Sequence, residues 1–219
     1  MDTARPRSGS RRPGRPRSAH SLDARRALVE AARELFSEAG FEGVSTKRLA
    51  ESAGVNPAMI HYYFGDKAGL HEVAFREGLA PLVERLSALS ERSTAPASLP
   101  EFFHVYMRTV AANPWLPKMI VRDVLPEGGR LRPLFVQTVG SRVGPVITGL
   151  VAGAQARGEV DDDLDPLLTT LSVVSLAVFP FLAWPVASRI LDLEMGDPLV
   201  EQLVEHTVAL FYHGAGTRP

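Results

Sequence analysis

Apolar residues recur at helical spacing along most of the chain, and no segment shows the two-residue alternation of a strand. The first helical segment has one apolar stripe, formed by Leu28, Ala32, Leu35, Phe36 and Ala39. Ser21 is expected to cap the start of this helix, and Gly40 to end it in the left-handed conformation. The pattern therefore predicts a first helix over about residues 21–39.

Two short helices joined by a sharp turn are predicted next. Thr46 is expected to cap the first of them, and the small side chain of Ala50 allows a crossing helix to approach closely. Gly54 follows four residues later and supplies the positive φ that a tight turn between helices requires. Asn56 is expected to cap the second helix, with Pro57 in its first turn.

The second of these short helices has an inner and an outer face. Ile60 and Phe64 are four positions apart and are expected to face a small core. Ala58, His61 and Tyr62 then remain on the outer face. A small residue, a glycine and a branched apolar residue at these offsets indicate a helix-turn-helix, whose second helix enters the major groove of DNA.

The rest of the chain is also predicted to be helical. A long helix from Lys67 to about Arg92 would connect the front and rear parts, and Pro81 is expected to kink it. Segments rich in Pro, Gly and Asp separate five further helices. These are expected over residues 99–112, 114–125, 130–158, 164–192 and 197–213. The fold class is all-α: an N-terminal three-helix helix-turn-helix domain, joined by a long helix to a C-terminal helical domain.

The most apolar stretch covers residues 167–187. Ser172 and Ser175 interrupt it, Pro180 and Pro185 break it, and acidic rather than basic residues precede it, which disfavours a transmembrane helix. A helix that is apolar nearly all round is instead expected to be buried on two sides, by its own domain and by a second subunit. The amphipathic helix that follows it is the expected partner in such an interface.

The 219-residue chain has a formal net charge of −1, but its charge is unevenly distributed. Residues 1–78 contain 13 Lys or Arg and 10 Asp or Glu, a balance of +3, whereas residues 79–219 contain 11 and 15, a balance of −4. A basic front and an acidic rear are expected when only the front meets a polyanion. The hydrophobic content of 45% excludes a wholly disordered chain.

The first 20 residues form a basic arm with six Arg and one Asp, rich in Pro, Gly and Ser, and are expected to be disordered in isolation. Gly14-Arg15-Pro16, flanked by Arg12 and Arg17, is similar to the core of an AT-hook, which lays Arg in a narrow minor groove. The alternative is a solubilising tail that contacts phosphates nonspecifically. The arm has no apolar core region, so it does not read as a secretory signal peptide.

No motif in the sequence predicts catalysis. The nucleophile elbow, the phosphate-binding loop, the zinc-protease motif and the dinucleotide fingerprint are all absent. The six His residues have no metal-ligand spacing, and a chain without Cys has no thiolate site. Asp161, Asp162 and Asp163 could attract a cation, but such a run beside a helix is usually a solvated N-terminal cap. We therefore expect no enzyme activity, no cofactor and no metal.

The segments on either side of the sharp turn complete a longer pattern. The first helix ends in Phe36-Ser-Glu-Ala-Gly-Phe-Glu-Gly-Val-Ser-Thr46, and the turn is followed by Tyr62-Tyr-Phe-Gly-Asp-Lys-Ala-Gly-Leu70. Over about residues 22–75 the chain resembles the DNA-binding domain of the tetracycline-repressor (TetR/AcrR) family of regulators. The resemblance implies a homodimer that binds palindromic double-stranded DNA and responds to a small-molecule inducer.

The same resemblance implies particular DNA contacts. Thr46, Lys47 and Lys67 lie where the family contacts phosphate, the last with help from a helix N-terminus. Tyr63 lies where a His is frequent, and its implied contact is from the hydroxyl to a phosphate. His61 lies where a Tyr is frequent, so base preferences do not transfer. The expected DNA-binding residues are Thr46, Lys47, Asn56, Ala58, His61, Tyr62, Tyr63 and Lys67, with Arg15 and Arg17 of the arm.

Several of these side chains also have a structural interpretation. Tyr62 and Tyr63 are alternatively half-buried core aromatics, and one of the two is expected to be partly in the core. His61 is alternatively a solvated surface residue. Lys67 is alternatively a charged helix start, although a cation is unfavourable there without an anion nearby.

The rear helices are implied to enclose the pocket for the inducer. Candidate lining residues are Phe102, Phe103, Tyr106, Trp115, Met119, Phe135, Phe179 and Trp184. For each of them the alternative is ordinary core packing, since aromatic residues at helical spacing usually just pack. His104, Arg108 and Arg122 are candidates for the polar end of a ligand, or else surface groups.

The expected function is that of a cytoplasmic, ligand-responsive transcriptional repressor with no membrane partner. An activator of the same fold and an architectural nucleic-acid-binding protein are the alternatives. The expected domains are the basic arm 1–20, a DNA-binding domain 21–68, a ligand-binding and dimerisation domain 69–214, and a tail 215–219. A two-fold dimer would hold its recognition helices about 34–36 Å apart or somewhat more.

Overall fold

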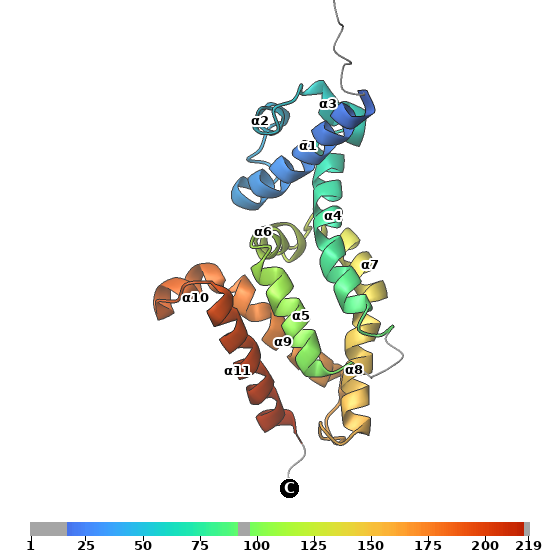
Figure 1. Cartoon of the computed structure of the whole chain (residues 1–219), viewed down its shortest axis with the longest axis vertical. Coiled ribbons are helices and arrows are strands. Elements are labelled where there is room, and N and C mark those ends of the chain that lie inside the picture. Colours follow the sequence, from blue (N-terminus) through green and yellow to red (C-terminus); the bar gives the residue numbers. More distant parts are fainter. Residues whose placement is uncertain (1–16, 92–96, 217–219) are drawn as a thin grey trace, which may run out of the picture.

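The computed structural model describes residues 17–91 and 97–216. Within these two ranges every regular element is a helix and none is a strand, which confirms the all-α prediction. Figure 1 shows an elongated molecule with a small helical domain at one end and a larger one at the other.

The small end, called the front domain below, contains the helix-turn-helix. It consists of α1 (Arg17–Ala39), α2 (Thr46–Ser52), α3 (Ala58–Phe64) and the first turns of α4 (Lys67–Ser87). Helix α4 runs from this domain into the rest of the molecule (Figure 1). It is the connecting helix that the sequence predicts. It ends at Ser87, before the predicted Arg92, and Pro81 lies within it without ending it.

The rear domain is formed by the remaining helices. They are α5 (Leu99–Ala111), α6 (Trp115–Met119), the π-helix η1 (Ile120–Val124), α7 (Arg132–Arg142), α8 (Gly144–Ala156), α9 (Pro166–Leu182), α10 (Trp184–Leu191) and α11 (Asp197–Ala215). Helix α11 packs on α5, and α8 packs on α7 and α9. These contacts bury the apolar stripes that the sequence displays.

Two predicted long helices are each split in the structure. The helix expected over 130–158 is interrupted at Val143, and the one expected over 164–192 bends by 70° between α9 and α10. Pro145 and Pro185 lie in the first turns of the second helix of each pair, where a missing backbone N–H is tolerated. The prediction of one helix over 164–192 was wrong because it weighed the apolar pattern above Pro185. Residues Arg132–Ala156 still run as one 25-residue helix apart from the local break at Val143.

Two predicted caps also differ from the structure. Helix α1 begins at Arg17, so Ser21 lies within it and does not cap it. Helix α2 is capped by Ser45, whose Oγ accepts a hydrogen bond of 3.1 Å from the Arg48 N–H, and Thr46 is its first helical residue. At the other end of α1, Gly40 has the predicted left-handed conformation with φ +71°.

A continuous apolar core runs through both domains. In the front domain Leu28, Phe36, Leu49 and Ile60 are fully buried, and the buried residues of α4 extend that core toward the rear domain. Burial of each such large side chain contributes about 1.5–3 kcal/mol to stability. The helix-turn-helix therefore packs on an apolar core that is continuous with the core of the rear domain.

Length and apolar composition alone would let the stretch Arg132–Ala156 cross a bilayer, and the bent pair α9 and α10 passes the same test together. Buried core helices have the same composition. Helix α7 packs on α4, and α9 packs on α5 and α8, with Val173, Ala177 and Phe181 buried. Both segments thus contribute to the protein core.

Candidate DNA-binding surface and effector pocket

The turn between α2 and α3 has the geometry predicted for a helix-turn-helix. Gly54 has φ +65°, and the backbone N–H of Val55 donates to the Ala50 carbonyl at 2.9 Å. The side chain of Asn56 accepts a hydrogen bond of 2.8 Å from the Ala58 N–H and so caps α3, as predicted. Ala50 is fully buried, which lets the two helices cross closely.

Helix α3 has the inner and outer faces expected of a recognition helix. Ile60 is fully buried, whereas Ala58 and His61 are exposed and Tyr62 is 75% exposed. Tyr63 is half-buried and packs on the core, with its ring centroid 4.8 Å from that of Tyr62. Of the two tyrosines, Tyr63 is therefore the one that belongs partly to the core.

His61 has a defined tautomer when its ring is neutral. Its Nδ1 lies 2.7 Å from the backbone carbonyl oxygen of Gly65. A carbonyl oxygen only accepts hydrogen bonds, so Nδ1 must carry the proton and donate it. The neutral ring then offers Nε2 as a hydrogen-bond acceptor on the exposed side of α3.

The first turn of α2 also lies at the surface. Thr46 is half-exposed, and the Lys47 side chain is 80% exposed, with its Nζ 3.8 Å from Glu51 of the same helix. An exposed ion pair of this kind contributes little to stability. Lys47 is therefore available for an anion outside the protein.

Lys67 has a different environment from Lys47. Its Nζ donates to the carbonyl oxygens of Phe41 at 2.9 Å and Val44 at 3.1 Å, and it lies 4.0 Å from the Phe41 ring centroid. These contacts attach the loop between α1 and α2 to the start of α4. An ammonium group has three donors, so two are used inside the protein.

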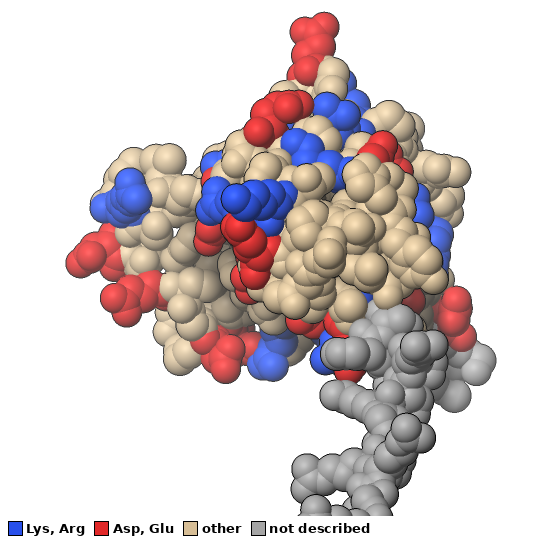
Figure 2. Space-filling model, turned by 90° about the horizontal axis from the view of Figure 1, so that it is seen from above, with Lys and Arg blue, Asp and Glu red and all other residues tan. Residues whose placement is uncertain are grey.

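Charge on the end of the molecule that holds the front domain is mixed. Seen from that end, Lys and Arg side chains are interspersed with Asp and Glu side chains (Figure 2). The described residues do not include Arg15, and Arg17 is described only as the first residue of α1. The predicted groove contacts of the basic arm therefore lie outside the described side chains.

The π-helix η1 joins the rear domain to two helices of the front domain. Arg122 Nη1 donates a hydrogen bond of 2.5 Å to the carbonyl oxygen of Glu38, near the end of α1. Asp123, the next residue, places Oδ2 3.4 Å from Nε2 of the fully buried His71 in α4. A π-turn within a helical segment frequently marks a functional position.

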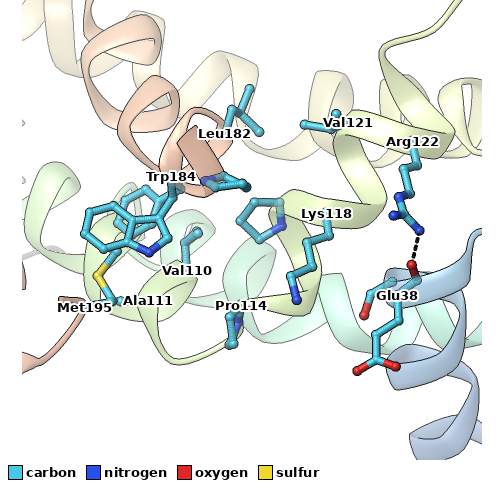
Figure 3. Close-up of a pocket in the computed structure, with 14 residues that line it drawn as sticks. Glu38, Val110, Ala111, Pro114, Lys118, Val121, Arg122, Leu182, Trp184 and Met195 are labelled. Atoms are coloured by element: carbon cyan, nitrogen blue, oxygen red, sulfur yellow. Dashed lines mark hydrogen bonds between the residues drawn. The ribbon is translucent and has the colours of Figure 1, made fainter. Parts of the chain in front are cut away.

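A pocket of about 490 Å³ lies beside this joint, between α1, the α5–η1 segment and the bend between α9 and α10. Figure 3 shows Trp184 and Met195 at one end of it, with Lys118 and Arg122 toward the other. We call this cavity the effector pocket. Its volume is within the range of about 300–1,000 Å³ that small-molecule sites occupy.

Only one of the eight predicted lining residues, Trp184, lines the effector pocket. Phe102, Phe103 and Met119 are buried in the core, and Phe179 is 67% exposed. The other three are half-buried and pack on neighbouring side chains: Tyr106 beside Phe102, Trp115 under the Arg33 guanidinium and Phe135 beside Phe75. Burial also raises the pKa of the Tyr106 hydroxyl above its ordinary value.

Of the three polar candidates, only Arg122 reaches the effector pocket. Arg108 pairs with Glu201, and His104 lies at the surface beside α11. Lys118 was missed, although it precedes Arg122 by four positions, a spacing that places both on one face of a helix. That spacing is the feature of the sequence from which Lys118 could have been predicted as a second cation of the site.

The helix-turn-helix geometry defines a class of nucleic-acid-binding domain, and comparison with known proteins shows which family this domain matches. Residues 28–74 match the model described as bacterial regulatory proteins of the tetR family. YttP of Bacillus subtilis, named "Probable HTH-type transcriptional regulator YttP", is 38% identical over 112 residues, 49% of this chain and 54% of that protein. The HTH-type transcriptional repressor AcnR of Corynebacterium efficiens is 36% identical over 66 residues, 30% of this chain and 35% of that protein.

Solved structures share the fold over nearly the whole chain. The fatty acid degradation regulator FadR from Bacillus halodurans has a TM-score of 0.70 at 16% identity, covering 89% of this chain and 97% of that one. FadR from Bacillus subtilis, in complex with stearoyl-CoA, has a TM-score of 0.63 at 18% identity, covering 84% of this chain and 97% of that one.

Residues 28–74 thus match the DNA-binding domain of tetR-family regulatory proteins, and the solved structures show that nearly the whole chain shares their fold. The sequence matches concentrate in the DNA-binding part, and the chain spans about a third to a half of the length of these curated relatives. Their names describe transcriptional regulators, which agrees with the expectation of a protein that is not an enzyme.

Proposed function

We propose that the protein is a homodimeric transcriptional repressor that binds palindromic DNA and is released by a small molecule. The outer face of α3 is the observation that carries this proposal. That face exposes Ala58, His61 and Tyr62, while Ile60 anchors the helix to the core. A short helix with this division fits the major groove, where base edges are read.

The residues around α3 fit two roles. Thr46, Lys47 and the third donor of Lys67 are proposed to contact phosphates, which supply affinity without sequence information. His61 is proposed to read a base edge: with Nδ1 bonded to the Gly65 carbonyl, the neutral ring has Nε2 as its hydrogen-bond acceptor. The exocyclic amino group of adenine or cytosine donates such a bond in the major groove.

An exposed apolar face of the rear domain supports a dimer. Exposed apolar residues on α9, α10 and α11 include Leu167, Leu168, Leu171, Phe179, Val186, Ile190 and Leu210. Helices α9 and α11 share a groove lined by Leu168 and Leu210, so part of this surface is continuous. Exposed apolar patches of this kind mark protein–protein contacts. In a two-fold dimer the patches of the two copies would bury each other.

The joint at η1 supports a switch by ligand. Val121 and Arg122 line the effector pocket, while Arg122 and Asp123 contact helices of the front domain. A ligand that binds one arrangement of η1 better than another would shift the front domain, and DNA would in turn change ligand affinity by the same factor. The similar FadR of Bacillus subtilis is described in complex with stearoyl-CoA, which supports a small molecule of some kind here.

The basic arm is proposed to add contacts next to the major-groove site. Its Arg residues would enter the minor groove or, in the alternative, contact phosphates. Deleting residues 1–16 leaves α1 whole, because that helix begins at Arg17. If the deletion variant loses affinity only for sites flanked by A·T pairs, groove insertion is supported. If it loses no affinity at low salt, the arm is only a solubilising tail.

The proposal is tested by placing an anion on the outer face of α3. Ala58→Glu should weaken binding to duplex DNA by at least about tenfold, because the carboxylate meets phosphates or base edges. Ala152→Glu, at an exposed position of α8, has the same charge and should bind normally. Fluorescence anisotropy of a labelled duplex measures both. Equal binding by the two variants would contradict the proposed role of α3.

A transcription assay with purified components distinguishes a repressor from an activator. A repressor lowers transcript from a promoter that contains the bound site, and the inducer restores it. A rise in transcript on binding would identify the activator instead. An architectural protein would bend DNA without a preferred site.

A further inference from the structure

The effector pocket has an apolar end and a cationic end. Trp184, Met195, Val110 and Ala111 gather at one side, and Figure 3 shows Lys118 and Arg122 toward the other. Further apolar lining comes from three prolines and three other apolar side chains: Pro114, Pro117, Pro185, Val121, Phe181 and Leu182. A ligand that fills this space has an apolar body and one polar end.

The charge at the polar end is positive on balance. Lys118 and Arg122 contribute two cations, and Glu38 contributes one anion to the lining. Among the described residues, no ion pair joins the Glu38 carboxylate to either cation. Arg122 instead donates to the backbone carbonyl of Glu38. The positive charge of Arg122 is therefore still available to an anionic group of a ligand.

We infer that the effector pocket binds an amphipathic anion, with an apolar chain or ring near Trp184 and a carboxylate-like head between Lys118 and Arg122. This inference rests on the proposed ligand-responsive function. A guanidinium fork matches a carboxylate in geometry, and hydrogen bonds between two charged groups are roughly twice as strong as neutral ones. A neutral ligand gains nothing comparable at this end of the pocket.

The same contact couples the ligand to DNA binding. The Glu38 carbonyl is among the last four of α1, which have no partner within the helix, and Arg122 satisfies it as a cation at a helix C-terminus. A carboxylate that binds through the Arg122 Nη1 donor displaces the Glu38 carbonyl from it. Binding of the ligand thus releases the end of α1 from η1, and the front domain loses one of its attachments to the rear domain.

Decanoate, decan-1-ol and decylamine are suitable probes, because they share one chain and differ in charge. The chain has two Trp residues, Trp115 and Trp184, and only Trp184 lines the effector pocket. In a Trp115→Phe variant, fluorescence therefore reports on the pocket alone. We expect decanoate to bind about tenfold more tightly than decan-1-ol, and decylamine least tightly.

Charge-removing variants locate the head group. Lys118→Met and Arg122→Met should each weaken decanoate binding by about three- to tenfold and leave decan-1-ol binding unchanged. Arg142→Met removes the same charge from an exposed position at the end of α7 and should change neither affinity. Arg122→Met should also abolish the effect of decanoate on DNA affinity. Equal affinity for decanoate and decan-1-ol would overturn the inference.

The two proposals fail in different ways. If decan-1-ol releases DNA as well as decanoate does, the ligand-responsive function stands and the anionic class is wrong. If decanoate binds with the expected charge dependence but no duplex is bound, the DNA-binding proposal is wrong and the ligand class stands. Fluorescence and anisotropy titrations of the same samples give both results.

Discussion

His71 Nε2 lies 3.4 Å from Asp123 Oδ2, and this buried contact joins the connecting helix α4 to η1 beside the effector pocket. Neither nitrogen of the His71 ring has a hydrogen-bond partner of good geometry, and the ring packs 4.5 Å from that of Phe36 and 5.1 Å from that of Phe41. Each polar group therefore depends on the other for compensation of its burial.

Asp123→Ala should lower the free energy of unfolding by about 3 kcal/mol, because it leaves His71 buried without its partner. The double variant His71→Phe with Asp123→Leu should recover most of that loss, since both polar groups are removed together. Urea unfolding measures both. If the double variant is no more stable than Asp123→Ala, the two residues are not energetically coupled.

His61→Ala should change base preference at one position of each half-site. Loss of the Nε2 acceptor removes discrimination of about 1–3 kcal/mol for a base pair with an amino donor, while phosphate contacts remain. Binding to a panel of single-base variants of the preferred site measures the change. An equal loss of affinity for every duplex would show that His61 does not read a base.

Lys47→Ala and Lys67→Ala form a matched pair for the phosphate contacts. Lys47 has no contact with the core, so its removal should flatten the salt dependence of binding by about one charge without changing stability. Lys67→Ala should flatten the dependence similarly and also lower the melting temperature, because Lys67 holds the loop between α1 and α2. Anisotropy at several salt concentrations and thermal unfolding separate the two effects.

For Lys67 an unchanged salt dependence with a lower melting temperature would contradict the phosphate contact and leave only its structural role. For Lys47 an unchanged salt dependence would place α2 away from the DNA backbone. The two residues thus test two different parts of the docking geometry.

Phe179→Asp should separate the proposed dimer into monomers, because a carboxylate would be buried within the apolar face. Val136→Asp is the control, since Val136 is similarly exposed, 61% against 67%, but lies on α7 outside that face. Sedimentation equilibrium at several protein concentrations measures the association. A Phe179→Asp variant that remains dimeric would place the interface elsewhere.

Much of the fold could be predicted from local chemistry. Gly40 and Gly54 have the positive φ that their positions in the sequence suggest, and Asn56 caps α3 as expected. Local signals suffice at these points because the conformation is decided within a few residues. The choice between neighbouring cap residues, such as Ser45 and Thr46, depends on backbone geometry that the sequence pattern does not distinguish.

The effector pocket could not be predicted in the same way. Phe102 and Phe103 are typical of an apolar ligand site in composition, yet both are core residues. The pocket forms where the bend at Ala183 brings Trp184 toward the α5–η1 segment. A space between distant segments depends on the angle of that bend, and the apolar periodicity of α9 contains no information about it.

The outward projection of α3 in a two-fold assembly is most directly tested by selecting duplexes from a random pool with the purified protein. We predict enrichment of an inverted repeat, with half-site centres separated by about 34–36 Å or somewhat more. Recovery of no preferred sequence, or of an isolated half-site bound by one subunit, would contradict the account.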